Sequence, residues 1–201
     1  MEIHQSKPLI LASTSKYRRG LLERLAVPFS CADPKTDETA NDNESPETLA
    51  RRLGDAKALA ISVLYPEAIV IGSDQVAALS SRRLGKPGSV TAAEAQLRLC
   101  SGQTVHFFTA VSFARSGHIV AQRCVPTTVK FRELSDPEIA DYVQREQPLD
   151  CAGSFRWEGL GICLFTALES DDPTALEGLP LIAVCDELRK MGLNLLNSSI
   201  Y

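Results

Sequence analysis

The chain has 201 residues, of which 44% are hydrophobic and 23% are charged, and its formal net charge is -4. This size allows one good hydrophobic core, and no run approaches the roughly 18 apolar residues needed to span a bilayer. A mildly acidic chain gives no reason to expect nucleic acid or a membrane surface as a partner, because both call for clustered positive charge.

The six cysteines are scattered and include no C-x-x-C pair. This spacing predicts neither a zinc site nor a disulfide framework, and we expect most of these cysteines to be small core residues. The first eight residues, MEIHQSKP, lack the basic start and apolar core of a signal peptide. The expected location is therefore the cytoplasm.

The first predicted elements lie in residues 9–19, LILASTSKYRR. A short apolar run predicts a buried strand, and serine followed by an amphipathic run predicts a capped helix. This geometry presents free N–H groups and a positive dipole end to an anion, and Ser13, Ser15 and Arg18 would add donors. At about 100° per residue, Arg18 falls on the apolar side of the helix, where it would point past the helix end. A capping serine with solvated arginines explains this stretch equally well.

Residues 27–32 read as a second short strand, and a polar loop carrying Glu38 follows. The next helix is marked by Ser45 at the N-cap and Pro46 at the first helical position. Lys57 lies at the edge of its apolar stripe, about 80° from Leu49. Such a lysine usually extends to solvent, but it could also reach into a cleft beside the core.

Residues 67–72, EAIVIG, predict a central strand covered on both faces. The strand is followed by Asp74 and Gln75, and a carboxylate placed where a buried strand leaves the sheet is typical of α/β active sites. We favour this interpretation over an aspartate that caps a turn. A hairpin over residues 76–84 then leads to Gly85 and Pro87, which would fix a turn around Lys86.

The second half of the chain predicts three helices, three strands and two loops. The expected helices cover residues 92–99, 135–143 and 181–191, and the expected strands cover 104–114, 118–131 and 162–165. Residues 153–161 form a glycine-punctuated loop with Trp157 and Glu158, and residues 168–176 are expected to be a mobile polar loop. With no repeat and no linker, residues 1–201 are expected to form a single domain.

The polar residues at the ends of these elements form a chemically coherent set. Its members are Ser13, Ser15, Arg18, Glu38, Lys57, Asp74, Gln75, Lys86 and Glu158. Cations can offset the charge of a triphosphate, one carboxylate can hold a divalent metal, and another can orient or deprotonate a water. The P-loop motif and the dinucleotide G-x-G-x-x-G are absent, which argues against those two classes.

Several short motifs appear in one order: LILASTSKYRR, IGSDQV, GKP, CAGSF and GLPLIA. Together they resemble the Maf family of nucleoside triphosphate pyrophosphatases, and within it the YceF-like subgroup that acts on 7-methyl-GTP. The resemblance implies an α/β fold with a mixed twisted sheet and flanking helices in two lobes, similar to inosine-triphosphate pyrophosphatases (Maf/Ham1). It also implies an active site in the cleft between the lobes.

The same resemblance implies hydrolysis to a nucleoside monophosphate and pyrophosphate in a house-cleaning role, with a divalent cation (Mg, Mn or Co) as cofactor. It makes Asp74 the catalytic acid/base, with Glu38, Lys57 and Lys86 as charged catalytic residues and Glu38 and Asp74 as metal ligands. Ser13, Ser15 and Arg18 would bind phosphate, and Tyr17, Gln75 and Glu158 would determine base specificity. Related sequences of the subgroup can carry tryptophan in place of Tyr17.

Physical chemistry supports the roles at the base. Methylation at N7 makes guanine cationic, so the Tyr17 ring would gain cation–π attraction. Glu158 can accept from the ring N–H and the exocyclic amine together, and Gln75 can present a donor and an acceptor. Trp157 could add a second stacking face, although a partly buried packing role is favoured.

Two other functions stay open at this point. One is the same reaction on dTTP or UTP, in the pyrimidine-directed branch of the family. The other is a nucleotide-binding regulator of septum formation and cell division, which would bind nucleotide without releasing pyrophosphate. A homodimer is compatible with the sequence, although no part of the chain demonstrates an interface.

Overall fold

The computed structural model describes residues 8–193 and 195–196. Its seven-stranded sheet has the order β2-β1-β3-β5-β6-β7, with β4 paired to β3. The strands are β1 (Leu9–Ala12), β2 (Ser30–Ala32), β3 (Ile69–Leu79), β4 (Arg82–Leu84), β5 (Thr104–Arg115), β6 (His118–Phe131) and β7 (Phe165–Ser170). The α-helices are α1 (Lys16–Glu23), α2 (Pro46–Ser62), α3 (Val90–Cys100), α4 (Asp136–Glu146) and α5 (Leu181–Lys190). Short 3-10 helices are η1 (Ala152–Ser154), η2 (Leu160–Leu164) and η3 (Pro173–Glu177).

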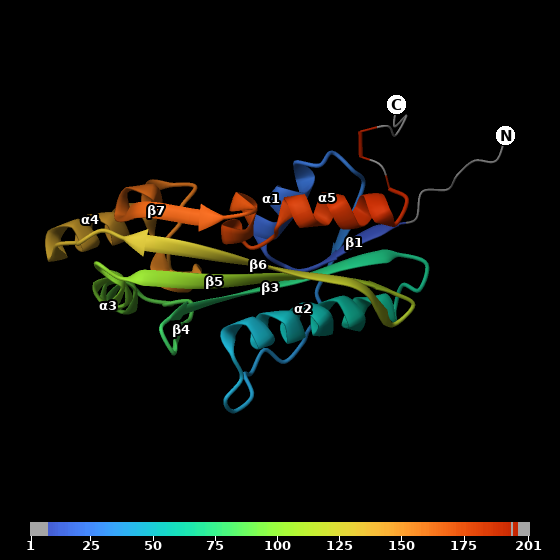
Figure 1. Ribbon diagram of the computed structural model, residues 1–201, viewed down its shortest axis with the longest axis horizontal. Helices are drawn as coiled ribbons and strands as arrows, with labels where there is room; N and C mark the ends of the chain where they lie inside the picture. Colours follow the sequence, from blue (N-terminus) through green and yellow to red (C-terminus); the bar gives the residue numbers. More distant parts are fainter. Residues whose placement is uncertain (1–7, 194, 197–201) are drawn as a thin grey trace.

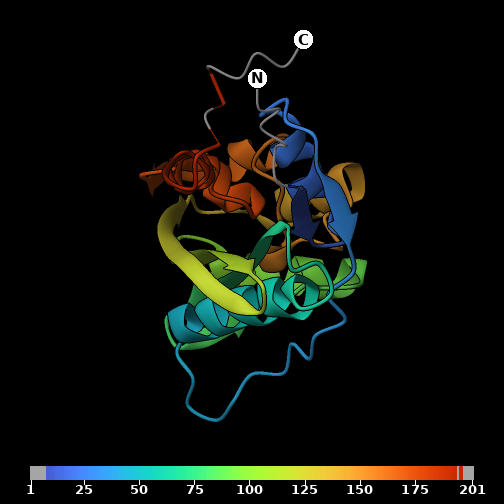
Figure 2. The same cartoon turned by 90° about the vertical axis from the view of Figure 1, so that its right-hand side faces the viewer.

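The sheet is mixed, because β1 pairs in parallel with β2 and β3 while the remaining pairs are antiparallel. Helices flank it on both sides: α2 lies against one face, and α1 and α5 lie against the other (Figures 1 and 2). The predicted α/β class with a mixed sheet and flanking helices is therefore confirmed.

The alternation of side chains along the strands explains how one sheet packs against helices on both of its faces. Leu11 and Ile71 pack with Leu22 of α1 and Leu188 of α5. Their neighbours in sequence point the opposite way, and Val70 packs with Ile61 of α2. Because successive side chains of a strand point to opposite faces, a continuous apolar run is what a strand buried on both faces requires.

A separate apolar cluster fills the other end of the sheet, where β7, α3 and α4 lie (Figure 1). Four phenylalanines meet there edge to face, and the centroids of contacting rings are 4.8–5.6 Å apart: Phe107, Phe131, Phe155 and Phe165. Trp157 packs against this cluster while partly buried, as expected. The strands β3, β5 and β6 run between the two clusters (Figure 1), and the single domain over residues 1–201 stays a prediction.

The strand predicted over residues 67–72 is shifted and much longer than expected. β3 continues through Asp74 and Gln75 to Leu79, because β5 pairs with it from Val70 to Ala78. Asp74 therefore lies inside a strand, and the prediction that it follows the strand's end was wrong. Asp74 is nevertheless accessible from the other edge of β3. There β1 pairs only as far as Ile71 and β4 pairing begins at Ala77, so neither strand covers the segment between these two residues.

The predictions for residues 162–176 were also wrong. Residues 160–164 form η2, and β7 starts only at Phe165. The expected mobile loop contains the second half of β7 and η3 except its last residue. It is organised by buried Asp172, whose carboxylate accepts from the N–H groups of Thr174 and Ile182. The prediction failed because the polar sequence suggested a solvated loop, whereas the carboxylate of Asp172 is buried and accepts hydrogen bonds from the backbone.

Three smaller differences concern boundaries and cysteines. The second strand is limited to Ser30–Ala32, and the helix predicted to begin after Thr91 is capped by Ser89, whose side chain accepts from Ala92 N. Of the six cysteines only Cys100 is buried, so the expectation of mostly core cysteines was wrong.

No helix in the described part of the chain has the length and apolarity to cross a membrane.

Candidate active site

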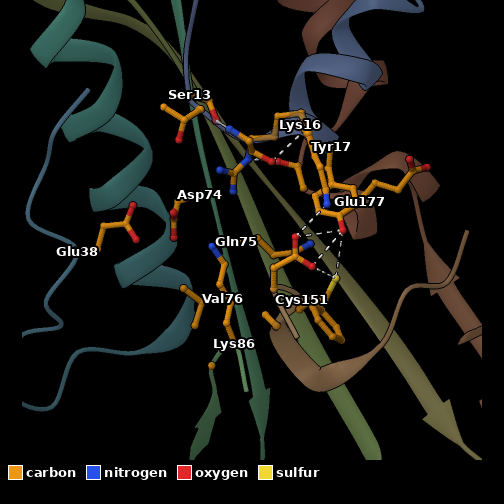
Figure 3. A pocket seen from close by; sticks show the side chains of 18 of the residues that line it. Ser13, Lys16, Tyr17, Glu38, Asp74, Gln75, Val76, Lys86, Cys151 and Glu177 are labelled. Atoms are coloured by element: carbon orange, nitrogen blue, oxygen red, sulfur yellow. Dashed lines mark hydrogen bonds and ion pairs between the residues drawn. The ribbon is translucent and has the colours of Figure 1, made fainter. Parts of the chain in front are cut away.

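A cleft of about 740 Å³ opens beside the uncovered segment of β3. All ten residues predicted for the site line it: Ser13, Ser15, Tyr17, Arg18, Glu38, Lys57, Asp74, Gln75, Lys86 and Glu158. Figure 3 shows two sides of this cleft, with Glu38, Asp74 and Lys86 on one and Tyr17, Cys151 and Glu177 on the other. The sequence thus predicted which residues come together, while the roles it assigned to them stay predictions.

The loop between β1 and α1 places hydroxyl groups at a helix N-terminus. Ser15 is the N-cap of α1 and accepts from Arg18 N at 3.4 Å, and its own N–H donates to Ser13 Oγ at 3.1 Å. Each hydroxyl retains its own hydrogen for donation. The loop is therefore suited to an anion, because first-turn N–H groups and the helix dipole favour negative charge.

The arginine of this helix is fixed by the backbone at the end of η3. Arg18 Nε donates to Gly178 O at 2.8 Å. Burial lowers the pKa of the guanidinium, while Asp74 and Glu38 act in the opposite direction. Arginine stays protonated under such influences, so Arg18 brings a permanent positive charge to the cleft.

The centre of the site is an ion-pair bridge through Lys57 of α2. Lys57 Nζ lies 2.6 Å from Asp74 Oδ1 and 2.6 Å from Glu38 Oε1, and the lysine is only 5% exposed. The expectation that Lys57 reaches into a cleft is thus met in the geometry. Burial opposes ionisation of Glu38, but Lys57, Lys86 and Arg18 outweigh it and lower the pKa of that carboxyl.

The amide of Gln75 is used within the protein. Its Nε2 donates to Thr109 Oγ1 at 3.0 Å and to the carbonyls of Ala175 and Leu176 at 2.8 and 3.1 Å. This geometry does not support the interpretation that Gln75 donates to a base or a phosphate. The amide nitrogen holds η3, and a role of Gln75 in base specificity stays a prediction.

Tyr17 forms one wall at the opposite side of the cleft. Its hydroxyl donates to Asp150 at 3.2 Å, and Lys16 Nζ and Arg156 Cζ lie 4.9 and 5.8 Å from its ring centroid. Glu158 is nearby and pairs with Arg156 at 3.4 Å. A ring held by its hydroxyl offers a fixed surface to a planar ligand.

Among the cleft residues that sequence reasoning missed are Asp150, Cys151 and Glu177. Asp150 and Glu177 are marked by no local pattern, and Cys151 opens the CAGSF motif, which by itself indicates no chemical role. Cys151 is no candidate nucleophile: burial raises its pKa to about 11, so the thiol stays protonated near neutrality.

The predicted charged set, Arg18, Lys57, Lys86, Glu38 and Asp74, thus lines one cavity, and such a composition suits a polyphosphate ligand. The chain belongs to the Maf family: the family model for Maf-like proteins matches residues 8–191. The chain is also similar over most of its length to three proteins named 7-methyl-GTP pyrophosphatase. The 7-methyl-GTP pyrophosphatase of Aromatoleum aromaticum is 57% identical over 92% of this chain and 96% of its own length. Those of Xanthomonas campestris pv. campestris (strain 8004) and Bordetella avium are 54% and 48% identical, over 93% and 98% of this chain and 97% and 99% of their lengths.

Among solved structures, the Ham1 protein of Staphylococcus aureus matches 65% of this chain and 73% of its own, with a TM-score of 0.42 and 16% identity. That similarity is too low to support an argument about this chain.

Proposed function

We propose that this protein hydrolyses 7-methyl-GTP to 7-methyl-GMP and pyrophosphate. One observation carries the proposal: Lys57 joins Glu38 and Asp74 at 2.6 Å in a cleft that also holds Arg18 and Lys86. The printed activity of relatives at 48–57% identity supplies the choice of nucleotide.

The reaction assigns a task to each charged group. Asp74 accepts a proton from a water whose oxygen attacks the α-phosphorus, and the bond to the bridging oxygen of the β-phosphate breaks. Pyrophosphate leaves with that oxygen. Lys57, Lys86 and Arg18 stabilise the charge that develops on the non-bridging oxygens, which is the main contribution that a protein makes to phosphoryl chemistry.

The donor set fits a hard divalent cation such as Mg²⁺. Glu38 and Asp74 would hold it, because such ions take one or two carboxylates and complete their shell with water and substrate phosphates. The described residues contain no group of three or more His, Cys, Asp or Glu side chains suited to a metal. When bound, the cation would neutralise charge on the polyphosphate.

The base would lie beside Tyr17. A cationic N7-methylated ring gains attraction from an aromatic face, and Glu158 can accept from the two N–H groups of the guanine edge. Pyrimidines lack that pair of donors. Replacing Glu158 by Ala is therefore expected to reduce activity on guanine nucleotides strongly and on dTTP or UTP little; the reverse pattern would favour the pyrimidine branch.

The decisive experiment is a screen for pyrophosphate release over canonical and methylated nucleoside triphosphates, with magnesium, manganese or cobalt and without metal. Asp74→Asn should abolish turnover and retain nucleotide binding, whereas Asp141→Asn, an exposed acid paired with Arg145 on α4, should behave as wild type. Tight binding without pyrophosphate release would favour the regulator of septum formation. Near wild-type hydrolysis by Asp74→Asn would show that the base is misassigned.

The location in the cytoplasm, a homodimer and the absence of nucleic-acid or membrane partners stay predictions from the sequence.

A further inference from the structure

Glu177, the last residue of η3, lines the cleft and carries a carboxylate that the proposed mechanism does not use. It lines the cavity on the side away from Glu38 and Asp74 (Figure 3), and its side chain is 20% exposed. Tyr17 lies on the same side, where the base is proposed to bind.

The backbone around Glu177 is held by side chains from three other elements. The carbonyl of Ala175 accepts from Thr109 Oγ1 and Gln75 Nε2, both at 2.8 Å, and the carbonyl of Gly178 accepts from Ser73 Oγ at 2.9 Å and Arg18 Nε at 2.8 Å. A group carried by a fixed backbone can discriminate between ligands, because it does not move to suit each of them.

The charge of Glu177 is poorly compensated compared with the charges of Glu38 and Asp150 in the same cleft. Its cationic partner Arg24, at the C-cap of α1, is 3.9 Å away, whereas Glu38 and Asp150 have ammonium partners at 2.6 and 3.3 Å. Burial and the nearby Glu158 raise the pKa of Glu177, and Arg24 offsets them only in part. The pKa values of Glu38 and Asp150 are lowered.

We infer that Glu177 selects the charge of the base: it favours a ring that carries a positive charge over a neutral ring of the same shape. The inference rests on the proposed function, since the proposed substrate differs from GTP by a methyl group that makes the guanine cationic. A partly desolvated carboxylate gains Coulomb energy from that ring and none from neutral guanine. Specificity then comes from electrostatics as well as from the hydrogen bonds offered by Glu158.

The test compares kcat/KM for 7-methyl-GTP with kcat/KM for GTP. Glu177→Gln keeps the shape of the side chain, and we expect the ratio of the two values to fall about fivefold, the size of one partly screened charge interaction. Arg24→Met removes the opposing cation and should raise the ratio. Glu169→Gln, an exposed acid paired with Lys130 on β6, is the matched control and should leave the ratio unchanged.

The pH dependence adds a readout that a purely structural role would not change. Glu158 and Arg24 face Glu177, and Arg156 pairs with Glu158. Below neutrality, where the methylated ring stays cationic, the ratio should rise with pH as Glu177 ionises, and Glu177→Gln should flatten that rise relative to wild type.

The two hypotheses fail separately. If the wild-type protein releases no pyrophosphate from 7-methyl-GTP, the proposed function fails. If it does, but Glu177→Gln keeps the wild-type ratio and its pH dependence, only the role of Glu177 is overturned. Loss of activity on both nucleotides to the same extent would likewise overturn charge selection.

Discussion

Lys57 and Asp74 form a buried ion pair, in which Nζ lies 2.6 Å from Oδ1 and the side chains are 6% and 11% exposed. Each charge compensates the desolvation of the other, and Glu38 adds a second contact from a more exposed side chain. The geometry links stability to the proposed catalysis, because Asp74, the proposed base, also neutralises the buried charge of Lys57.

Removing the cation should therefore destabilise the fold. Lys57→Met leaves a buried carboxylate unpaired, and we expect a loss of about 3 kcal/mol in the free energy of unfolding, measured in urea. The double variant Lys57→Met with Asp74→Asn should recover part of that loss, because it no longer leaves a lone buried charge. Additive effects of the two substitutions would contradict a coupled pair.

How far the sequence predicted this site depends on how local each signal is. Ser15, Ser45 and the apolar runs act within a few residues, so the starts of α1 and α2 and the long strands β5 and β6 were found. Asp74 was found for an incorrect reason, since a polar triplet in a strand looks like the end of that strand until its partner is known. The pairing of Asp74 with Ala110 supplies what local sequence lacks.

The missing part of the site depends on contacts that span the chain. Gln75 Nε2 donates to the carbonyl of Ala175, one hundred residues away, and so supports η3. No periodicity or capping pattern encodes such a relationship.

Gln75 can be tested as a positioning residue. Gln75→Leu removes donors to two carbonyls of η3, and we expect a loss of about 2 kcal/mol in unfolding free energy together with a higher KM for 7-methyl-GTP. Gln144→Leu, at an exposed site on α4, serves as the control. A higher KM with unchanged stability would instead restore the direct role at the base that the sequence suggested.

The contact between α2 and β3 depends on a glycine. A Cβ at Gly72 would lie 2.5 Å from the backbone nitrogen of Ala58 and 2.9 Å from its Cβ, so the helix could not keep its place. We expect Gly72→Ala to cost about 3 kcal/mol or more, with lower activity because Lys57 is on the same helix. Gly20→Ala in α1 meets nothing within 4 Å and should be neutral or stabilising by up to about 1 kcal/mol. Thermal unfolding of both variants checks this, and equal midpoints would refute the close approach.

Acid should weaken the start of α4 through one carboxylate. Glu138 accepts from Ser135 Oγ at 2.6 Å and Ser135 N at 2.8 Å and pairs with Arg132 at 2.9 Å, and these contacts lower its pKa to about 2 from about 4.5. The unfolded chain therefore binds this proton more readily than the folded protein. The stability that Glu138 contributes is complete above about pH 4.5 and is lost as the pH falls toward about 2.

Glu138→Gln should lower stability near neutrality and lose less stability than wild type across that window. Urea titrations at several pH values measure this, with Glu67→Gln, whose side chain is 87% exposed, as the control; parallel curves for wild type and Glu138→Gln would rule the linkage out.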